Sequence, residues 1–436
     1  MKKLSMFQIT LLAVFGALAV AGVLIFALAV GGGNAKTVGP VTIWGTLDSG
    51  AFTTVLRQVA DVDASMNQVS YVQKDTSTFQ SELTEALASG QGPDIFVMTD
   101  SYAVKDAEKV VSIPFKSFSE TQFKNTFAEA AESFIGSDGI LALPFAADPL
   151  VLYWNRDMLS SAGFSQPPGY WDQLFTMAQK LTVRDDSGSI LKSALAFGEY
   201  QNVANAKDIL AALILQAGGT ITGKDSVGNL QSALVSKTGG ISSQATVSAL
   251  RFFTEFADPS KDDYSWNRSL PDARTSFTSG DLALYVGFVS EEAKIARMNP
   301  NLNFAIAPLP QIRNAERALN VARVYAFAAP KSGKNPSSAI LVASVLSSSD
   351  NAQALSSALA LPPVRRDLLE KSAGGDVDLF NKMTIISHSW LDPDPVATAG
   401  IFRAMIEDTT SGAALINEAV SRADQQLGHL LSQQRE

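Results

Sequence analysis

The runs VTIWG at residues 41–45, VSYVQ at 69–73 and IFVM at 95–98 decide the fold. Each run is rich in β-branched or aromatic residues and has the length of a strand. Helical patterns separate the runs, one starting at Ser49 and one ending at Gly90. A β-α-β-α-β series predicts a parallel sheet, and ligands of such sheets gather at the carboxyl ends of the strands.

The chain then passes through a helical middle and returns to strands. Its 436 residues exceed what one hydrophobic core usually supports, so we expect two domains of about 150–200 residues. Extended segments are expected at 139–143 and 151–155, helices at 171–181, 206–217 and 242–256, and later strands at 282–286, 304–307 and 324–327. Strands that follow a helical middle indicate a chain that leaves one domain, builds a second and comes back.

Composition and charge disfavour several classes of function. The chain is 46% hydrophobic and 18% charged, which is typical of a globular protein. It has no Cys and only two His, far apart in the sequence, so we expect no disulfide, no metal or cofactor site and no Ser/His/Asp triad. The net charge is −9, and because residues 1–36 hold three lysines and no acid, the remainder carries −12. This charge disfavours a nucleic-acid partner.

The first 36 residues differ from the rest. Lys2 and Lys3 precede a segment, residues 11–30, that is apolar or Gly throughout. This length fits a transmembrane helix, which needs ~20 apolar residues, better than the ~7–15 of a cleaved signal. Ala-Leu-Ala at residues 27–29 has the form of a signal-peptidase site and keeps cleavage open as the alternative. The positive-inside rule places the rest of the chain on the extracytoplasmic side, tethered by a glycine-rich linker.

An ordered set of short motifs matches one family. The motifs are VTIWG (41–45), ASGQGPDIF (88–96), LPF (143–145), LYWNRD (152–157), PPGYW (167–171), FTSG (277–280) with Gly287, PLP (308–310) and, more loosely, WLDP (390–393). In this order they resemble the bacterial extracellular solute-binding proteins of carbohydrate importers, the maltose-binding protein family. Many relatives are held by a lipid on an N-terminal Cys, whereas this chain has no Cys, so its apolar segment would supply the tether.

The resemblance implies an α/β, two-lobed periplasmic-binding-protein-like fold with a multi-crossing hinge, to which the chain adds an N-terminal transmembrane helix. The expected boundaries are residues 1–36 for the anchor and linker, 37–147 and 322–364 for lobe 1, and 148–321 and 365–436 for lobe 2, with crossings near 146–149, 308–323 and 362–366. The implied function is capture of a sugar by hinge closure and delivery to the permease of an ABC importer. We expect a monomer held at the cell membrane.

Five aromatic residues are candidate sugar platforms, because sugars present apolar C–H faces between hydroxyl edges. Trp44 ends the first strand, and Trp266 and Trp390 lie in polar loops, where exposed aromatic residues favour binding. The resemblance adds Trp171, which matches a family tryptophan at a helix start, and Phe288, which matches a Gly-aromatic contact. A role in the core is the alternative for each, since large aromatic residues are usually buried.

Four charged residues complete the candidate site. Asp48 and Asp100 follow the first and third strands, where they either accept sugar hydroxyls or cap a helix. Asp148 lies between two apolar segments, and the resemblance pairs it with an acidic sugar ligand of the family. A buried carboxylate needs a partner, which a hydroxyl pair or Arg323 could supply.

Other functions stay open from the sequence alone. A peptide or polyamine binder would use the same fold for another ligand. A glycoside-acting enzyme needs two carboxylates about 5–10 Å apart, and Asp48, Asp100 and Asp148 could include such a pair. A purely structural surface protein would need neither a hinge nor tryptophans in loops. We expect a binding protein without enzymatic activity, because the matching motifs belong to a binding family.

Overall fold

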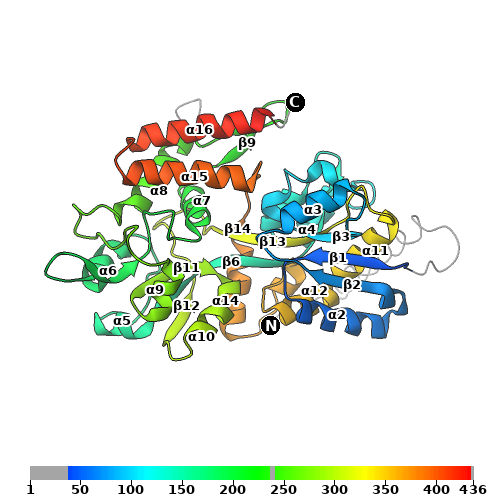
Figure 1. The fold of residues 1–436 in the computed structure, drawn as a ribbon, viewed down its shortest axis with the longest axis horizontal. Coiled ribbons are helices and arrows are strands. Elements are labelled where there is room, and N and C mark those ends of the chain that lie inside the picture. Colours follow the sequence, from blue (N-terminus) through cyan, green and yellow to red (C-terminus); the bar gives the residue numbers. More distant parts are fainter. Residues whose placement is uncertain (1–37, 236–240, 434–436) are drawn as a thin grey trace, which may run out of the picture.

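The computed structural model describes residues 38–235 and 241–433. The predicted anchor and linker at residues 1–36 lie outside this part of the chain. Among the residues that are described, no helix is long and apolar enough to cross a membrane. Their buried apolar side chains form two separate cores, and each core belongs to one lobe. The lobes lie side by side along the long axis of the molecule (Figure 1).

Lobe 1 contains the β-α-β-α-β series that the sequence predicts. Strands β1 (Val41–Gly45), β2 (Val69–Gln73) and β3 (Ile95–Thr99) pair in parallel in the order β2-β1-β3, so the predicted parallel arrangement is confirmed. The other elements of this lobe are α2 (Ser49–Val62), α3 (Phe79–Ala88), β4 (Ile113–Pro114), α4 (Glu120–Thr126), β5 (Gly139–Ile140), α11 (Pro336–Leu346), α12 (Ser349–Leu359) and α13 (Arg366–Leu369). Gly90 follows α3 with φ of 69°, a conformation that glycine adopts without strain, as expected of a helix end.

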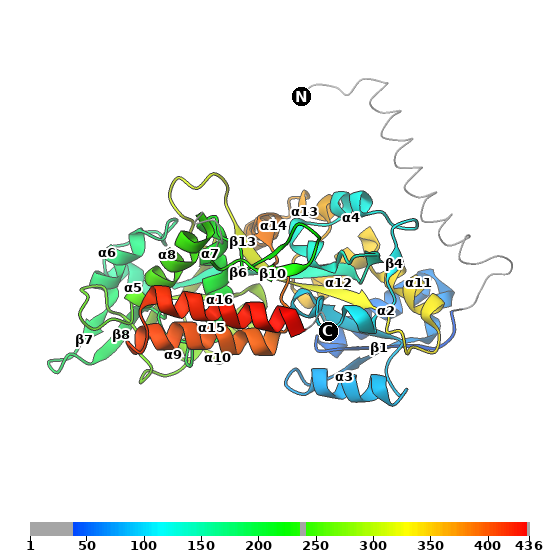
Figure 2. The ribbon, with the colours of Figure 1, turned by 90° about the horizontal axis from the view of Figure 1, so that it is seen from above.

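Lobe 2 contains the helical middle of the chain. Its elements before β13 are α5 (Arg156–Ser161), α6 (Gln173–Leu181), β7 (Val183–Arg184), β8 (Ile190–Leu195), α7 (Ala206–Gln216), β9 (Thr222–Lys224), β10 (Leu230–Ser232), α8 (Ile241–Glu255), α9 (Ala273–Ser279), β11 (Leu282–Phe288), α10 (Glu292–Met298) and β12 (Phe304–Ala307). The chain adds α14 (Gly375–Ile385), β14 (Ser387–His388), α15 (Pro395–Thr410) and α16 (Ile416–Gln433) after its last passage between the lobes. Viewed from above, α15 and α16 lie along the flank of this lobe (Figure 2).

Two long strands join the lobes into one sheet. Strand β6 (Leu143–Asn155) pairs antiparallel with β13 (Asn320–Ala328), and both run between the lobes (Figure 1). The sequence predicts two separate extended segments here, residues 139–143 and 151–155, with Pro144 following the first. That expectation was wrong, because β6 is continuous. Pro144 lies opposite Ala326 of β13, beside a shift in register, and Pro149 lies opposite Ala322 in the regular part of the ladder.

The third passage between the lobes lies later than expected. The resemblance implies a crossing near residues 362–366. In the structure, however, Leu368 and Leu369 still pack in the core of lobe 1, and Phe380 is the next residue that packs in the core of lobe 2. The first two crossings lie in β6, which contributes Ala147 to one core and Leu150 to the other, and in β13, which contributes Ala322 and Val321 in the same way.

Candidate ligand-binding cleft

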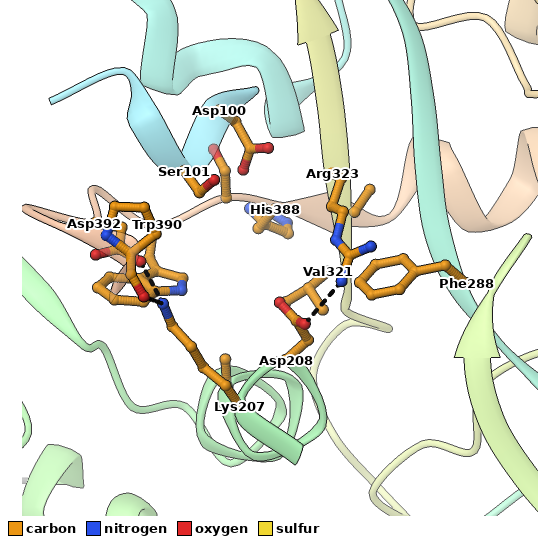
Figure 3. A pocket seen from close by; sticks show the side chains of 14 residues that line it. Asp100, Ser101, Lys207, Asp208, Phe288, Val321, Arg323, His388, Trp390 and Asp392 are labelled. Atoms are coloured by element: carbon orange, nitrogen blue, oxygen red, sulfur yellow. Dashed lines mark hydrogen bonds and ion pairs between the residues drawn. The ribbon is translucent and has the colours of Figure 1, made fainter. Parts of the chain in front are cut away.

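A cavity of about 190 Å³ opens between the lobes beside β13 (Figure 3). Its polar and aromatic lining comprises Asp100 and Ser101 after β3, Lys207 and Asp208 in the first turn of α7, Phe288 at the end of β11, Arg323 on β13, and His388, Ser389, Trp390 and Asp392 after α14. Because both lobes supply walls of this cavity, a rotation of one lobe against the other would open or close it.

Arg323 lies on the strand that forms the cavity floor. Its Nη2 is 3.4 Å from Asp208 Oδ2, and its guanidinium carbon lies 3.6 Å from the centre of the Phe288 ring. On the neighbouring strand β6, Asp148 is directly opposite Arg323. The Arg323 side chain is still 43% exposed. A guanidinium has five N–H donors, so Arg323 keeps donors for a ligand in the cleft.

Asp148 supports the cleft from beneath. It is 0% exposed and does not line the cavity. Its Oδ1 accepts the backbone N–H of Ser290 at 2.9 Å, whereas its Oδ2 has no hydrogen-bond partner in the described part of the chain. Burial raises the pKa of Asp148 to about 6, against the opposing charge of Arg323. This carboxylate therefore interacts electrostatically with Arg323 and does not itself reach the cavity. The resemblance implies instead that it accepts a hydrogen bond from a sugar hydroxyl.

Asp100 links lobe 1 to the hinge. Its Oδ1 accepts the backbone N–H of Val324, on β13, at 2.8 Å. The residue is only 9% exposed, yet it forms part of the cavity wall. Burial raises the pKa of Asp100 to about 7 against the effect of that hydrogen bond, and the negative charge of Asp208 adds to the rise.

A buried network holds Phe288 and the start of α7 in place. Glu291 accepts hydrogen bonds from Tyr285 Oη at 2.6 Å, from Arg274 Nε at 2.6 Å and from Asn205 Nδ2 at 2.8 Å. Burial alone would raise the pKa of Glu291, but these donors outweigh it and hold the pKa below its usual value. Gly287 leaves room for the network, since a Cβ there would lie 2.6 Å from the Tyr285 ring and 3.0 Å from Glu291.

Trp390 forms an aromatic wall of the cavity, and lobe 2 fixes its position. Its ring stacks on Phe402 at 6.1 Å between centres, with 26° between the planes. The Lys207 ammonium lies 5.3 Å from the Trp390 ring and bonds Asp392 Oδ2 at 2.6 Å. Burial raises the pKa of Asp392, and the Lys207 charge opposes this rise. The tryptophan therefore has a defined orientation before any ligand binds.

The structure brings together four of the nine predicted site residues in the cavity wall, and a fifth lies directly behind it. The four are Asp100, Phe288, Arg323 and Trp390, and the fifth is Asp148. These five residues come from five strands or loops, and Asp100 and Trp390 are 290 residues apart in the sequence.

Trp44 and Asp48 lie outside the cavity lining. Trp44 packs partly buried against the core of lobe 1, with the Lys74 ammonium 3.8 Å from its ring centre. Asp48 caps α2 by accepting the Ala51 N–H at 2.7 Å, which is the alternative role that the sequence left open. The carboxyl end of β3 borders the cavity. The carboxyl end of β1, which is one strand further from β13 in the sheet, does not.

Trp171 and Trp266 are core residues of lobe 2. Trp171 is 4% exposed and donates its Nε1–H to Gln216 at 2.6 Å. The expectation that Trp266 lies exposed in a polar loop was wrong, because it is 1% exposed and donates to Asn202 at 3.0 Å. Its polar neighbour Ser265 bonds the backbone of β8, so the loop packs onto the sheet and buries the indole.

Sequence reasoning missed six polar residues of the cavity lining, namely Ser101, Lys207, Asp208, His388, Ser389 and Asp392. Helix α7 reads AKDILAALILQ, and its two adjacent charges open a helix that is otherwise almost wholly apolar. That contrast was the available signal for Lys207 and Asp208. Asp392 lies within the WLDP motif, which contributes to the family resemblance, but sequence reasoning assigns it no role in the site.

The raised pKa values of Asp100 and Asp148 predict that stability falls as pH rises. In the folded state Asp100 keeps its proton up to about pH 7 and Asp148 up to about pH 6, whereas an Asp in the unfolded chain loses its proton near pH 4. Between the pKa of the unfolded state and that of the folded state, folding takes up protons. The contribution of Asp100 to the free energy of unfolding should therefore decrease by up to about 2–3 kcal/mol from pH 5 to pH 7.5.

Urea unfolding of the wild type and of Asp100→Asn at both pH values measures this effect. The variant should be the less pH-dependent of the two, because Asn does not titrate and can still accept the Val324 N–H. An equal pH dependence in both proteins would contradict the assignment.

In the residues that the structure describes, no group of three or more His, Asp or Glu side chains is placed to hold a metal ion. The cavity offers carboxylate acceptors, guanidinium donors and an aromatic wall. These groups can bind a polar molecule and hold its orientation.

Comparisons with known proteins agree with this geometry. The family model described as bacterial extracellular solute-binding protein matches residues 66–353. A binding protein of Brucella abortus is 22% identical over 236 residues, which is 52% of this chain and 52% of that protein. The chain spans about half the length of the curated relatives it matches.

Solved structures show the same fold. A cyclo/maltodextrin-binding protein in complex with maltotetraose superposes with a TM-score of 0.71 at 18% identity, covering 91% of this chain and 98% of the other. A solute-binding protein of an ABC transporter from Thermotoga lettingae, bound to α-D-tagatose, gives a TM-score of 0.67 at 20% identity over 90% of this chain and 100% of the other. Both likenesses confirm the predicted two-lobed α/β fold.

Proposed function

Since the chain belongs to the bacterial extracellular solute-binding protein family, we propose that it captures a small carbohydrate in the cleft between its lobes and delivers it to the permease of an ABC importer. The observation that carries the proposal is the cavity at β13, where both lobes place polar groups around one fixed tryptophan. The family consists of binding proteins, so the glycoside-acting enzyme is not proposed.

The chemistry of the lining supports a sugar. Trp390 offers an apolar face for C–H groups, while Asp208 and Arg323 offer an acceptor and donors for hydroxyls. The cavity of about 190 Å³ lies below the ~300–1,000 Å³ of typical drug-sized sites, so we propose a ligand of about one sugar ring. Two similar structures carry maltotetraose and tagatose, which supports the class of ligand and leaves its size to experiment.

Two contacts across the cleft support hinge closure as the capture step. Lys105 of lobe 1 bonds Asp394 of lobe 2 at 2.6 Å, and Glu129 of lobe 1 lies 2.8 Å from His388. Burial lowers the pKa of His388 while Glu129 opposes the shift. Contacts of this kind form only when the lobes are close, so a ligand that binds both lobes would favour the closed form.

Ligand should therefore increase energy transfer between dyes placed on the two lobes. The chain has no Cys, so Thr84→Cys on α3 and Gln425→Cys on α16 can be labelled selectively at exposed positions. In both views α3 and α16 lie on the same side of the molecule, one on each lobe (Figures 1 and 2). A sugar panel screened by thermal shift supplies the ligand, because a ligand that binds only the folded state raises apparent stability.

The control pair, Thr84→Cys with Asn67→Cys, lies within lobe 1 and should show no change in transfer. A ligand that binds by calorimetry without changing transfer between the lobes would rule out closure. Absence of a thermal shift with every sugar would count against carbohydrate capture, and a shift with peptides or polyamines would point to the alternative ligands.

We also propose that residues 1–36 tether the protein, as a monomer, to the outer face of the cell membrane. The uncharged length of residues 11–30 supports a retained helix. The protein should then stay with membranes after a carbonate wash, and a variant lacking residues 1–36 expressed with a cleavable signal should not. Release of the wild type into the medium, with a new N-terminus after residue 29, would favour cleavage instead.

A further inference from the structure

We propose that the ligand of this cleft is a small polyol that carries one positive charge, an amino sugar in chemical class, whose ammonium group binds between Asp100 and Asp208. The inference rests on the proposed function and narrows its ligand. It follows from a count of which charged groups around the cavity are already paired with each other and which are left for a ligand.

Lys207 is not available to a ligand. Its ammonium bonds Asp392 Oδ2 at 2.6 Å, Thr398 Oγ1 at 2.7 Å and the Pro395 carbonyl at 3.3 Å. An ammonium has three N–H donors, and these three acceptors use all of them. Lys207 and Asp392 therefore form a closed pair whose charges cancel, and the pair orients Trp390.

The charges of two further sets of groups, which join the lobes, also cancel. Lys105 pairs with Asp394 at 2.6 Å. Glu129 lies between Arg317, at 4.0 Å, and His388, at 2.8 Å. Because burial lowers the pKa of His388, this group of three has one negative and one positive charge at neutral pH. Neither set compensates the carboxylates further inside.

Among the side chains that the structure describes, one cation, Arg323, then remains for three carboxylates, Asp100, Asp148 and Asp208. Arg323 is 3.4 Å from Asp208 and directly opposite Asp148, and it acts electrostatically on Asp100 as well. Asp208 lies in the first turn of α7, where the helix dipole stabilises negative charge. An inner group with three acids and one base has an excess of negative charge, and a cationic ligand would reduce it.

Asp100 is the acid that gains most from such a ligand. It is nine-tenths buried in the cavity wall, its Oδ1 accepts the Val324 backbone N–H, and no cationic side chain within residues 38–235 and 241–433 donates a hydrogen bond to it. Burial raises its pKa to about 7, with Asp208 adding to the rise, which is the behaviour of a carboxylate without sufficient compensation. An ammonium group bound between the two acids would stabilise the ionised form of Asp100.

The rest of the lining suits hydroxyl and C–H groups. Ser101 and Ser389 line the cavity with hydroxyls, and Arg323 keeps exposed donors. Trp390 provides the only indole face among the described lining residues. A simple diamine would leave these groups without partners, so the geometry favours a polyol with one amine.

Calorimetry on the full chain in detergent tests the proposal with matched sugars. The charged probes are D-glucosamine, D-galactosamine and D-mannosamine. Their uncharged counterparts are D-glucose, D-galactose and D-mannose, together with the N-acetyl derivatives of the three amines. Putrescine serves as a cation without hydroxyls. At pH 7.5 and low salt at least one amine should bind about 10- to 150-fold more tightly than its neutral parent, the range of a charge-assisted hydrogen bond. Asp100→Asn and Asp208→Asn should each reduce that ratio toward one.

Asp63→Asn is the matched control, because Asp63 is an exposed helix cap of lobe 1 that bonds Ser65 and should leave the ratio unchanged. Binding of neutral sugars at least as tightly as the amines would overturn the charge inference and leave sugar capture intact. Binding of putrescine but no sugar would overturn both proposals. Absence of binding by every amine at millimolar concentration would overturn the inference as well.

Discussion

Replacing Trp171 with alanine should lower the free energy of unfolding by about 3–5 kcal/mol and leave the ligand affinity of the folded protein unchanged. The ring packs between Phe197 and Phe252, with centres 5.9 Å away in both cases. Its Nε1–H is the donor to Gln216 Oε1, at 2.6 Å. Truncation would open a cavity and leave a buried amide oxygen without its donor, and both effects destabilise.

Urea unfolding measures the stability and calorimetry the affinity. Tyr170→Ala is the control beside it in the sequence, since Tyr170 is exposed and has only the Arg313 guanidinium, 4.2 Å from its ring, as a cation–π partner. Tyr170→Ala should lower the free energy of unfolding by less than about 1 kcal/mol. A Trp171→Ala protein with normal stability and lost affinity would return Trp171 to the binding site, as the family resemblance allows.

Replacing Trp390 with alanine should weaken ligand binding by at least about 2 kcal/mol, or roughly 30-fold. Trp390 is the aromatic wall of the cavity, and its stacking on Phe402 presents it in one orientation. Calorimetry with the tightest sugar from the panel measures the loss. Stability must be followed in parallel, because the lost contact with Phe402 also destabilises lobe 2 to some extent.

Two further variants separate binding from packing. Trp390→Phe keeps an aromatic face on Phe402 and should retain most of the affinity. Trp44→Ala removes an indole of the same size from lobe 1 and should leave the affinity unchanged, because Trp44 lies outside the cavity lining. Normal affinity in Trp390→Ala would remove Trp390 from the site, and a large loss in Trp44→Ala would restore the prediction made from its place at the end of β1.

Local patterns were sufficient for much of the fold. Helix α2 buries Phe52, Val55, Leu56 and Val59, the spacing of one helical face, and the strands beside it are short apolar runs. Each of these signals lies within one segment. The break predicted between residues 143 and 151 is absent because a distant segment acts on this one: β6 is held in extended form by its pairing with β13, which is about 180 residues away.

The cleft could be predicted only in part. Asp100 was found because the ends of parallel strands border the ligand site, and Arg323 because a buried acid needs a partner. Lys207 and Asp208 were missed because a helical pattern does not show which way the first turn faces. Their position at the cavity depends on the packing of α7 against β13.

Periodicity and short motifs were enough to predict most strands and helices, the two-lobed class of fold and the family. The burial of each tryptophan and the lack of a cation beside some carboxylates became visible only in the folded chain. Trp171 and Trp390 look alike as sequence, yet Phe197 and Phe252 enclose one ring while the other borders the cavity. Burial and charge balance are sums over neighbours from distant segments, so no single segment contains them.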